Sequence, residues 1–100
     1  MLRIIKVTGK SLSPEYQAGD YVILTTPPFF FNSLKPGDMV VFRHPEHGTL
    51  IKKVEHFSPE QGTIFVVGSH PTSIDSRQFG PIRKKDLIGK VFWHVPKPRR

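Results

Sequence analysis

The stretch Gly37-Asp38-Met39-Val40-Val41-Phe42 decides how this chain folds. Its second half is a short run of apolar and β-branched residues, which is typical of a β-strand. Gly37 supplies the positive φ of a tight turn and Asp38 can bond to the backbone beyond it, so this pair marks the start of the strand. The same dipeptide, Gly19-Asp20, precedes a second apolar run. Two copies predict two similar strand entries, not a repeat fold.

Similar short runs recur along the chain between Gly, Pro and Asp residues. They predict strands at Leu2 to Val7, Tyr21 to Thr25, Met39 to Phe42, Leu50 to Val54, Ile64 to Val67 and Leu87 to Val95. Apolar residues do not recur with helical spacing over more than about two turns, and ten prolines break longer candidates. We therefore expect helix only as single turns, near residues 13–18 or 83–86. The predicted fold class is all-β, a small coiled β-sheet or partly open barrel that hides the sheet edges.

Length and composition limit the protein to one small domain. One hundred residues can form a single modest core, so we expect one domain at residues 1–96 and a basic tail at 97–100. The absence of cysteine excludes disulfides, thiolate chemistry and cysteine-ligated metals. Among the five histidines only His44 and His47 are close in sequence, in a proline-containing loop, where such a pair is typically solvated. The sequence therefore predicts no metal and no cofactor.

The formal net charge of +7 favours an anionic partner such as nucleic acid, an acidic substrate or a phospholipid surface. Basic residues are concentrated late in the chain, at Arg83-Lys84-Lys85 and in the tail, which we interpret as a solvated edge and a chain end. The charge allows one alternative function: a non-catalytic small basic β-barrel that binds nucleic acid or an acidic partner. The motifs described below do not support that alternative, and we expect no nucleic acid partner.

The hydropathy pattern predicts no transmembrane segment, because no run approaches the roughly 18 apolar residues that a span needs. The expected location is therefore cytoplasmic or peripheral to a membrane. One aromatic cluster, Phe29-Phe30-Phe31, lies between turn-forming residues. These rings could make a peripheral membrane contact or line a peptide groove, or they could simply close one end of the core.

Lys52 and Ser11 together suggest nucleophilic chemistry. A serine hydroxyl needs a neutral base, and a lysine can serve only if burial lowers its pKa from about 10.4. Because side chains alternate along a strand, Lys52 shares a face with two apolar neighbours, whereas Lys53 shares the other face with Glu55. This contrast favours Lys52 as the base. Around Ser11, Gly9 lets the backbone approach a substrate, and the Ser11 N–H is a candidate donor to an oxyanion.

The ordered motifs of the chain resemble the successive boxes of the type I signal peptidase family. They are Gly9-Lys10-Ser11-Leu12-Ser13-Pro14 with Gly19-Asp20, Gly37-Asp38-Met39-Val40-Val41-Phe42, Ile51-Lys52-Lys53-Val54, Ser73-x-Asp75-Ser76-Arg77-x-Phe79-Gly80 and Ile88-Gly89-Lys90-Val91. The resemblance implies a serine endopeptidase with a Ser/Lys dyad and a sheet of the signal peptidase and repressor-protease type. It makes Ser11 the nucleophile and Lys52 the general base.

The same resemblance implies roles for residues around the dyad. Ser73 would help to orient the lysine amine, and Asp75 and Arg77 would form a supporting ion pair. An extended peptide would bind by β-augmentation, main-chain pairing with shallow pockets. Our candidates for the wall of the pocket are Val7, Leu12 and Ile51, each of which could equally be an ordinary core residue.

The chain departs from the family pattern in several places. Leu12 stands where the family commonly has Met, and Gly9 stands where some bacterial members place a hydroxyl that assists the oxyanion. Gly68-Ser69-His70 replaces the family's Gly-Asp-Asn, which leaves open a degenerate peptidase without turnover. Signal peptidases also carry an amino-terminal anchor, whereas Ser11 lies near the start of this sequence.

The small size resembles the maturation proteases of nickel-containing superoxide dismutase. That subgroup suggests a polypeptide partner, a preprotein or the proform of a nickel superoxide dismutase, from which a leader or propeptide is cut. A self-cleaving relative of the repressor type is disfavoured, because ten residues precede Ser11 and the Ala18-Gly19 pair follows it too closely.

Overall fold

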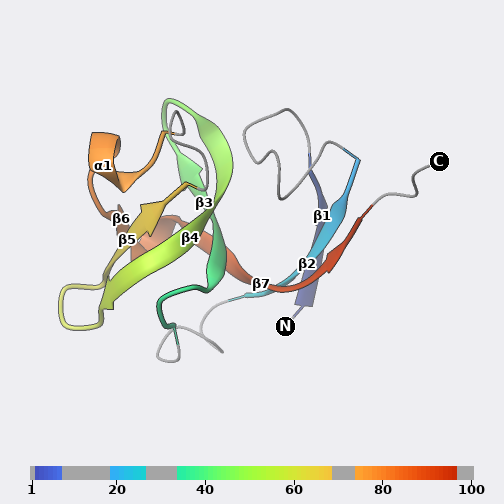
Figure 1. Ribbon diagram of the computed structural model, residues 1–100, viewed down its shortest axis with the longest axis horizontal. Coiled ribbons are helices and arrows are strands. Elements are labelled where there is room, and N and C mark those ends of the chain that lie inside the picture. Colours follow the sequence, from blue (N-terminus) through green and yellow to red (C-terminus); the bar gives the residue numbers. More distant parts are fainter. Residues whose placement is uncertain (1, 8–18, 27–33, 69–73, 97–100) are drawn as a thin grey trace.

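The computed structural model describes residues 2–7, 19–26, 34–68 and 74–96. They form one antiparallel sheet of seven strands in the order β1-β2-β7-β3-β4-β5-β6 (Figure 1). The strands are β1 (Leu2–Lys6), β2 (Tyr21–Thr25), β3 (Met39–His44), β4 (Gly48–Ser58), β5 (Thr63–Val67), β6 (Ile82–Arg83) and β7 (Leu87–Val95). A helical turn, α1 (Ser76–Phe79), and a 3-10 turn, η2 (Lys84–Asp86), flank β6. The sheet is not closed, and β1 and β6 are its edges.

The all-β prediction is confirmed. The described strands form one sheet that is not closed into a barrel. The strands at Tyr21–Thr25 and Leu87–Val95 have the predicted bounds, and η2 lies in one of the two predicted helical regions. The other region, residues 13–18, lies outside the described residues. The sequence pattern did not predict β6, which has only two residues. It also did not predict α1, because the start of this helical turn is marked by a capping side chain and not by an apolar repeat.

Strand β3 is buried on both faces of the sheet around residues 40–42, and so is β4 around residues 50–51. Val40 and Phe42 belong to one hydrophobic cluster and Val41 belongs to the other. β4 repeats the arrangement, with Leu50 in the first cluster and Ile51 in the second. The first cluster is formed mainly by residues of β3, β4, β5 and β6, and the second by residues of β2, β3 and β4 with Val7. In Figure 1, strands β3 to β6 form one lobe of the molecule, and β1 and β2 lie in the other. This two-sided burial explains why the deciding stretch is a continuous apolar run instead of an alternating one.

The two Gly-Asp dipeptides make the same backbone pattern. Gly37 and Gly19 both have φ of 97°, a value that favours glycine. The Gly37 N–H donates to Val54 O at 2.9 Å, and the Val54 N–H donates to Asp38 O at 2.7 Å. The Gly19 N–H likewise donates to Val7 O at 2.9 Å, and the Val7 N–H donates to Asp20 O at 2.7 Å. The predicted similarity of the two strand entries is therefore confirmed.

Strand β7 connects the two lobes, because its first half pairs with β3 and its second half pairs with β2. Gly89 lies at this crossing and is buried. A Cβ atom at this position would lie 3.0 Å from Leu24 Cβ and 3.0 Å from the Thr25 carbonyl oxygen. The close approach of β7 to β2 therefore favours glycine, because a side chain here would force Leu24 or the Thr25 carbonyl to shift.

Among the described residues, no helix is long and apolar enough to cross a bilayer.

The substitution Gly89→Ala tests the crossing. Because the added methyl group meets the backbone of β2, we expect the free energy of unfolding to fall by about 1–3 kcal/mol. Urea denaturation followed by circular dichroism measures this change. As a control, Thr49→Ala at the exposed start of β4 should change stability by less than about 0.5 kcal/mol. Equal stability of Gly89→Ala and the wild type would contradict the packing described here.

Candidate active site at Lys52 and Asp75

Lys52 is a buried lysine in the middle of β4, where it pairs with Val40 of β3. Its relative exposure is 4%, whereas Lys53 on the opposite face is exposed. Leu50 and Val54, which share its face, both belong to the first hydrophobic cluster. The alternation of β4 therefore places the amine on an apolar face, as the sequence predicted from its neighbours.

Two effects act on the pKa of Lys52. Burial lowers it below the ordinary value of 10.5, because an apolar environment disfavours the charged ammonium form. The negative charge of Asp75 acts in the opposite direction and is the smaller effect. The net shift is downward, which is the direction that a lysine base requires.

Asp75 is fully buried, and it lies close to Lys52 because of the pairing of β4 with β5. Lys53 pairs with Val67 at the end of β5, and the N–H of the next residue, Gly68, donates to Asp75 Oδ2 at 2.8 Å. Arg77 binds both carboxylate oxygens, Nε to Oδ1 at 3.0 Å and Nη2 to Oδ2 at 2.7 Å. The predicted ion pair is thus present in the structure. Whether it supports catalysis stays a prediction.

The pKa of Asp75 reflects competing influences. Burial alone would raise this pKa. It is outweighed by the hydrogen bonds from the Arg77 side chain and from the backbone N–H groups of Gly68 and Arg77, together with the charge of Arg77. Together they lower the pKa of Asp75 from 3.8 to about 2. The carboxylate is therefore charged at neutral pH and exerts a fixed negative field on Lys52.

Asp75 and Ser76 dock α1 onto the end of β5, and Arg77 and Gln78 hold Asp75 in place. Asp75 caps the helical turn, and the Gln78 side chain accepts a hydrogen bond from the Asp75 N–H at 2.9 Å, which completes a capping box. Buried Ser76 accepts a hydrogen bond from the Val66 N–H of β5 at 2.9 Å. The sequence analysis assigned no role to Ser76 or Gln78. The signal for Gln78 was available, since an acid followed three residues later by Gln is a capping-box pattern.

Four predicted site residues, Gly9, Ser11, Leu12 and Ser73, lie outside the described residues. Their roles therefore stay predictions.

The structure does describe both ends of the segment that carries Gly9, Ser11 and Leu12. The backbone hydrogen bonds between Val7 and the Gly19-Asp20 dipeptide bring these ends together. Fully buried Asp20 is held in turn by His94 of β7, at 2.8 Å from His94 Nε2 to Asp20 Oδ2.

Val7 and Ile51, the other candidates for a substrate pocket, are 3% and 4% exposed and lie in the second hydrophobic cluster. Ile51 faces away from Lys52, because consecutive residues of a strand point to opposite faces. Their burial favours the core interpretation, which the sequence left open for each of them. A role in substrate binding stays a prediction.

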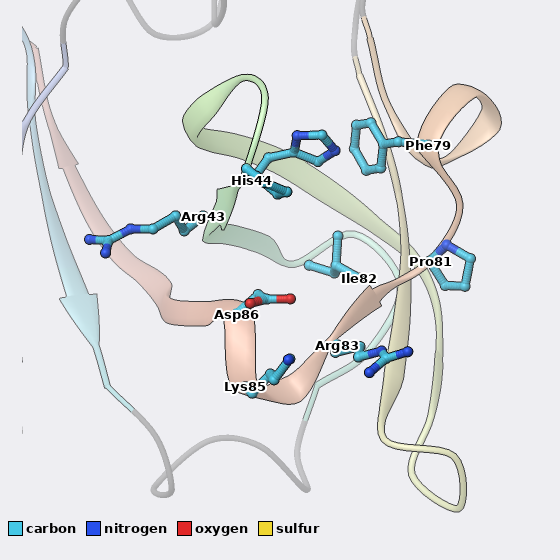
Figure 2. Close-up of a pocket in the computed structure, with 9 residues that line it drawn as sticks. Arg43, His44, Phe79, Pro81, Ile82, Arg83, Lys85 and Asp86 are labelled. Carbon is cyan, nitrogen blue, oxygen red and sulfur yellow. The ribbon is translucent and has the colours of Figure 1, made fainter.

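One pocket of about 250 Å³ lies away from this region, between the end of β3, α1, β6 and η2 (Figure 2). Its lining residues are Arg43, His44, Pro45, Phe79, Pro81, Ile82, Arg83, Lys85 and Asp86. Neither Lys52 nor Asp75 lines it. The buried Lys52 amine and this pocket are therefore separate features of the described structure.

Comparison with known proteins identifies the relatives of this chain. The model of a family described as Peptidase S24-like matches residues 1–92. The chain is also 25% identical, over an alignment of 136 positions, to the protein named Signal peptidase I V of Bacillus subtilis (strain 168). That alignment covers 86% of this chain and 81% of the relative.

The all-β sheet and these two similarities define a peptide hydrolase of the type I signal peptidase-like class. More specifically, the chain belongs to the Peptidase S24-like family. A polypeptide substrate follows from membership of a peptidase family.

The charge on Asp75 predicts a particular dependence of stability on pH. Because its folded pKa of about 2 lies below the ordinary 3.8, its contribution is complete above pH 3.8 and is lost as the pH falls toward 2. We expect Asp75→Asn to lower the free energy of unfolding at pH 7 by about 1–3 kcal/mol. The difference from the wild type should shrink between pH 4 and pH 2.

Urea denaturation at a series of pH values measures both effects. The matched control is Glu60→Gln, an exposed acid in the turn between β4 and β5. This control should stay close to the wild type throughout. A constant difference between Asp75→Asn and the wild type from pH 7 down to pH 2 would be inconsistent with the charged, hydrogen-bonded carboxylate.

Proposed function

We propose that the protein is a serine endopeptidase in which Ser11 attacks the scissile carbonyl and Lys52 is the general base. The observation that carries the proposal is the burial of the Lys52 amine, at 4% exposure, on an apolar face with a lowered pKa. A lysine buried for stability alone is rare, because desolvation of its charge is unfavourable. Membership of a peptidase family supplies the reaction class.

In the proposed reaction the neutral Lys52 amine takes the proton of the Ser11 hydroxyl as the Ser11 oxygen bonds to the carbonyl carbon. The resulting ammonium returns a proton to the leaving amine, and water then hydrolyses the acyl-enzyme by the same route. Asp75 stabilises the transient ammonium through its negative charge. Burial lowers the pKa of the Lys52 amine and so favours its neutral form before the attack, whereas the Asp75 charge favours the ammonium that forms during it.

The proposed substrate is a preprotein or proenzyme from which a leader or propeptide is removed. The relative's name, a signal peptidase, supports this class of substrate. The proform of a nickel superoxide dismutase stays one candidate, on the resemblance of motifs and size alone. The departure at Gly68-Ser69-His70 leaves the Asp75 contact in place, because Gly68 contributes its backbone N–H.

Two variants test the dyad directly. Ser11→Ala and Lys52→Met should each lower turnover by at least about 10³-fold, because each removes one member of a coupled pair. The assay incubates purified protein with a panel of preproteins, including a nickel superoxide dismutase proform, and identifies the products by mass spectrometry. Wild-type turnover should rise with pH as the Lys52 amine loses its proton.

The matched control is Lys53→Met, which removes the neighbouring lysine from the exposed face of β4. Lys53→Met should keep wild-type turnover. Lys52→Met should remain folded and be no less stable than the wild type, since an apolar side chain replaces a buried amine. Cleavage that persists in both Ser11→Ala and Lys52→Met, or that Lys53→Met abolishes equally, would exclude the proposed mechanism.

We also propose a peripheral contact with a membrane. The predicted contact at Phe29-Phe30-Phe31 lies outside the described residues. A second apolar surface is described, on one face of β1, β2 and β7, where the register aligns Ile4, Ile23 and Trp93. Ile4 is 65% exposed and Trp93 is 62% exposed. We call this surface the apolar face; its further members are Leu2, Tyr21 and Val95.

An anionic bilayer fits the apolar face better than a second copy of the chain does. The protein carries a net charge of +7, so two copies repel each other whereas acidic lipids attract it. Lys6 pairs with Tyr21 at one end of the apolar face and places a cation beside the aromatic ring. Aromatic rings next to lysine are typical of side chains that lie at a lipid interface.

Trp93, the single tryptophan of the chain, reports on this contact. Vesicles that contain phosphatidylglycerol should shift its emission to shorter wavelength and bind the protein, and salt should weaken that binding. Ile4→Ser should weaken binding by about tenfold, since it removes one buried aliphatic side chain from the contact. Ile74→Ser, at an exposed position outside the apolar face, should have no effect. Unchanged emission, or equal effects of the two variants, would refute the membrane contact.

A further inference from the structure

The turn that joins β3 to β4 brings together three potential metal ligands. His44 pairs with Gly48 across the hairpin, and the turn between them contains Glu46 and His47. One ligand atom from each of His44, Glu46 and His47 lies within 4.8 Å of the other two. The sequence pattern indicated only the two imidazoles, as a solvated pair. The structure adds a carboxylate to the pair.

His44 is held in an orientation that suits a ligand. Its Nδ1 accepts hydrogen bonds from the backbone N–H of Glu46 at 3.1 Å and of His47 at 3.3 Å. These hydrogen bonds direct the Nδ1 lone pair into the turn, and a metal ion at Nδ1 would take their place. The ring is half-buried and contacts Phe79, with a centroid separation of 4.7 Å (Figure 2).

The donor set selects the class of metal. Two imidazoles and one carboxylate suit zinc and similar divalent transition ions, whereas Ca²⁺ and Mg²⁺ prefer oxygen ligands alone. Tetrahedral bonds of roughly 2.0–2.1 Å place neighbouring ligand atoms roughly 3.3 Å apart. The three side chains must therefore close in from their present separation. Glu46 and His47 are exposed, and water can replace the two backbone hydrogen bonds to His44.

Cations near the turn repel a metal ion and so limit the affinity of the three ligands for it. Arg43 and Lys85 line the same pocket as His44. The guanidinium of Arg43 extends away from the His44 ring, and Lys85 lies beside Asp86 (Figure 2). The charge of Glu46 offsets part of the remaining positive field.

We infer that His44, Glu46 and His47 form a zinc site that closes the β3–β4 hairpin. Three protein ligands leave the fourth position of the ion to water. The ion ties the end of β3 to the turn that leads into β4, the strand that carries Lys52, and it takes no part in the proposed dyad. This inference does not depend on the proposed peptidase function.

Calorimetric titration of the metal-free protein with Zn²⁺ tests the inference. We expect one equivalent to bind, and about ten times the dissociation constant of free Zn²⁺ to raise the melting temperature by roughly 5–10 °C. Glu46→Gln and His47→Gln should each weaken binding at least about tenfold. His44→Asn should do the same while keeping the turn, because the Asn side chain can still accept the backbone N–H two residues on.

The matched control is His56→Asn. His56 Nδ1 lies 3.7 Å from Glu55 Oε1, and both side chains are exposed. The two residues form a histidine–acid pair outside the proposed site. Its loss should leave zinc affinity unchanged. Three outcomes would overturn the inference: zinc binding that survives all three ligand variants, zinc binding that His56→Asn weakens equally, and no detectable binding in the wild type. The first two outcomes would indicate an adventitious ion only. Co²⁺ absorption bands typical of tetrahedral nitrogen and oxygen ligands provide a second readout.

Discussion

The burial of the Lys52 amine near the charged Asp75 carboxylate is the constraint on which the site depends. A charged amine and a charged carboxylate are both unfavourable in a small core without compensation. Asp75 is compensated by Arg77 and by two backbone N–H groups, so it stays charged. Lys52 has no comparable compensation from Asp75, since burial outweighs that attraction. The site therefore holds a fixed negative charge beside a lysine that releases its proton readily.

The sheet topology makes this arrangement possible in one hundred residues. Because the face of β4 that carries Leu50, Lys52 and Val54 packs into the first hydrophobic cluster, Lys52 is shielded from solvent even in a small open sheet. The helical turn α1 then closes over the end of β5, where Ser76 and Asp75 accept the N–H groups of Val66 and Gly68. These two side chains take the place of a neighbouring strand at the point where the pairing of β5 ends. The motif Asp75-Ser76-Arg77-Gln78 is thus explained by hydrogen bonding before any catalytic role is assigned.

The sequence predicted those features that local pattern determines. Short apolar runs located all the longer strands, and the neighbours of Lys52 identified the lysine that is buried. What it could not supply depends on pairing between distant segments. The two-sided burial of β3, the requirement for Gly89 at the β2–β7 crossing and the third ligand near His44 all arise from strand register or turn geometry. The positions of Ser11 and Ser73 lie outside the described residues, so the dyad itself stays a proposal.

The state of the Lys52 amine is the most direct test of this view of the site. Nuclear magnetic resonance titration of protein with ¹³C-labelled lysine measures the pKa of each amine, and the signal missing from Lys52→Met assigns Lys52. We expect Lys52 to titrate below its ordinary value of 10.5 while the protein remains folded. A Lys52 amine that titrates at or above 10.5 in the folded protein would contradict the central claim.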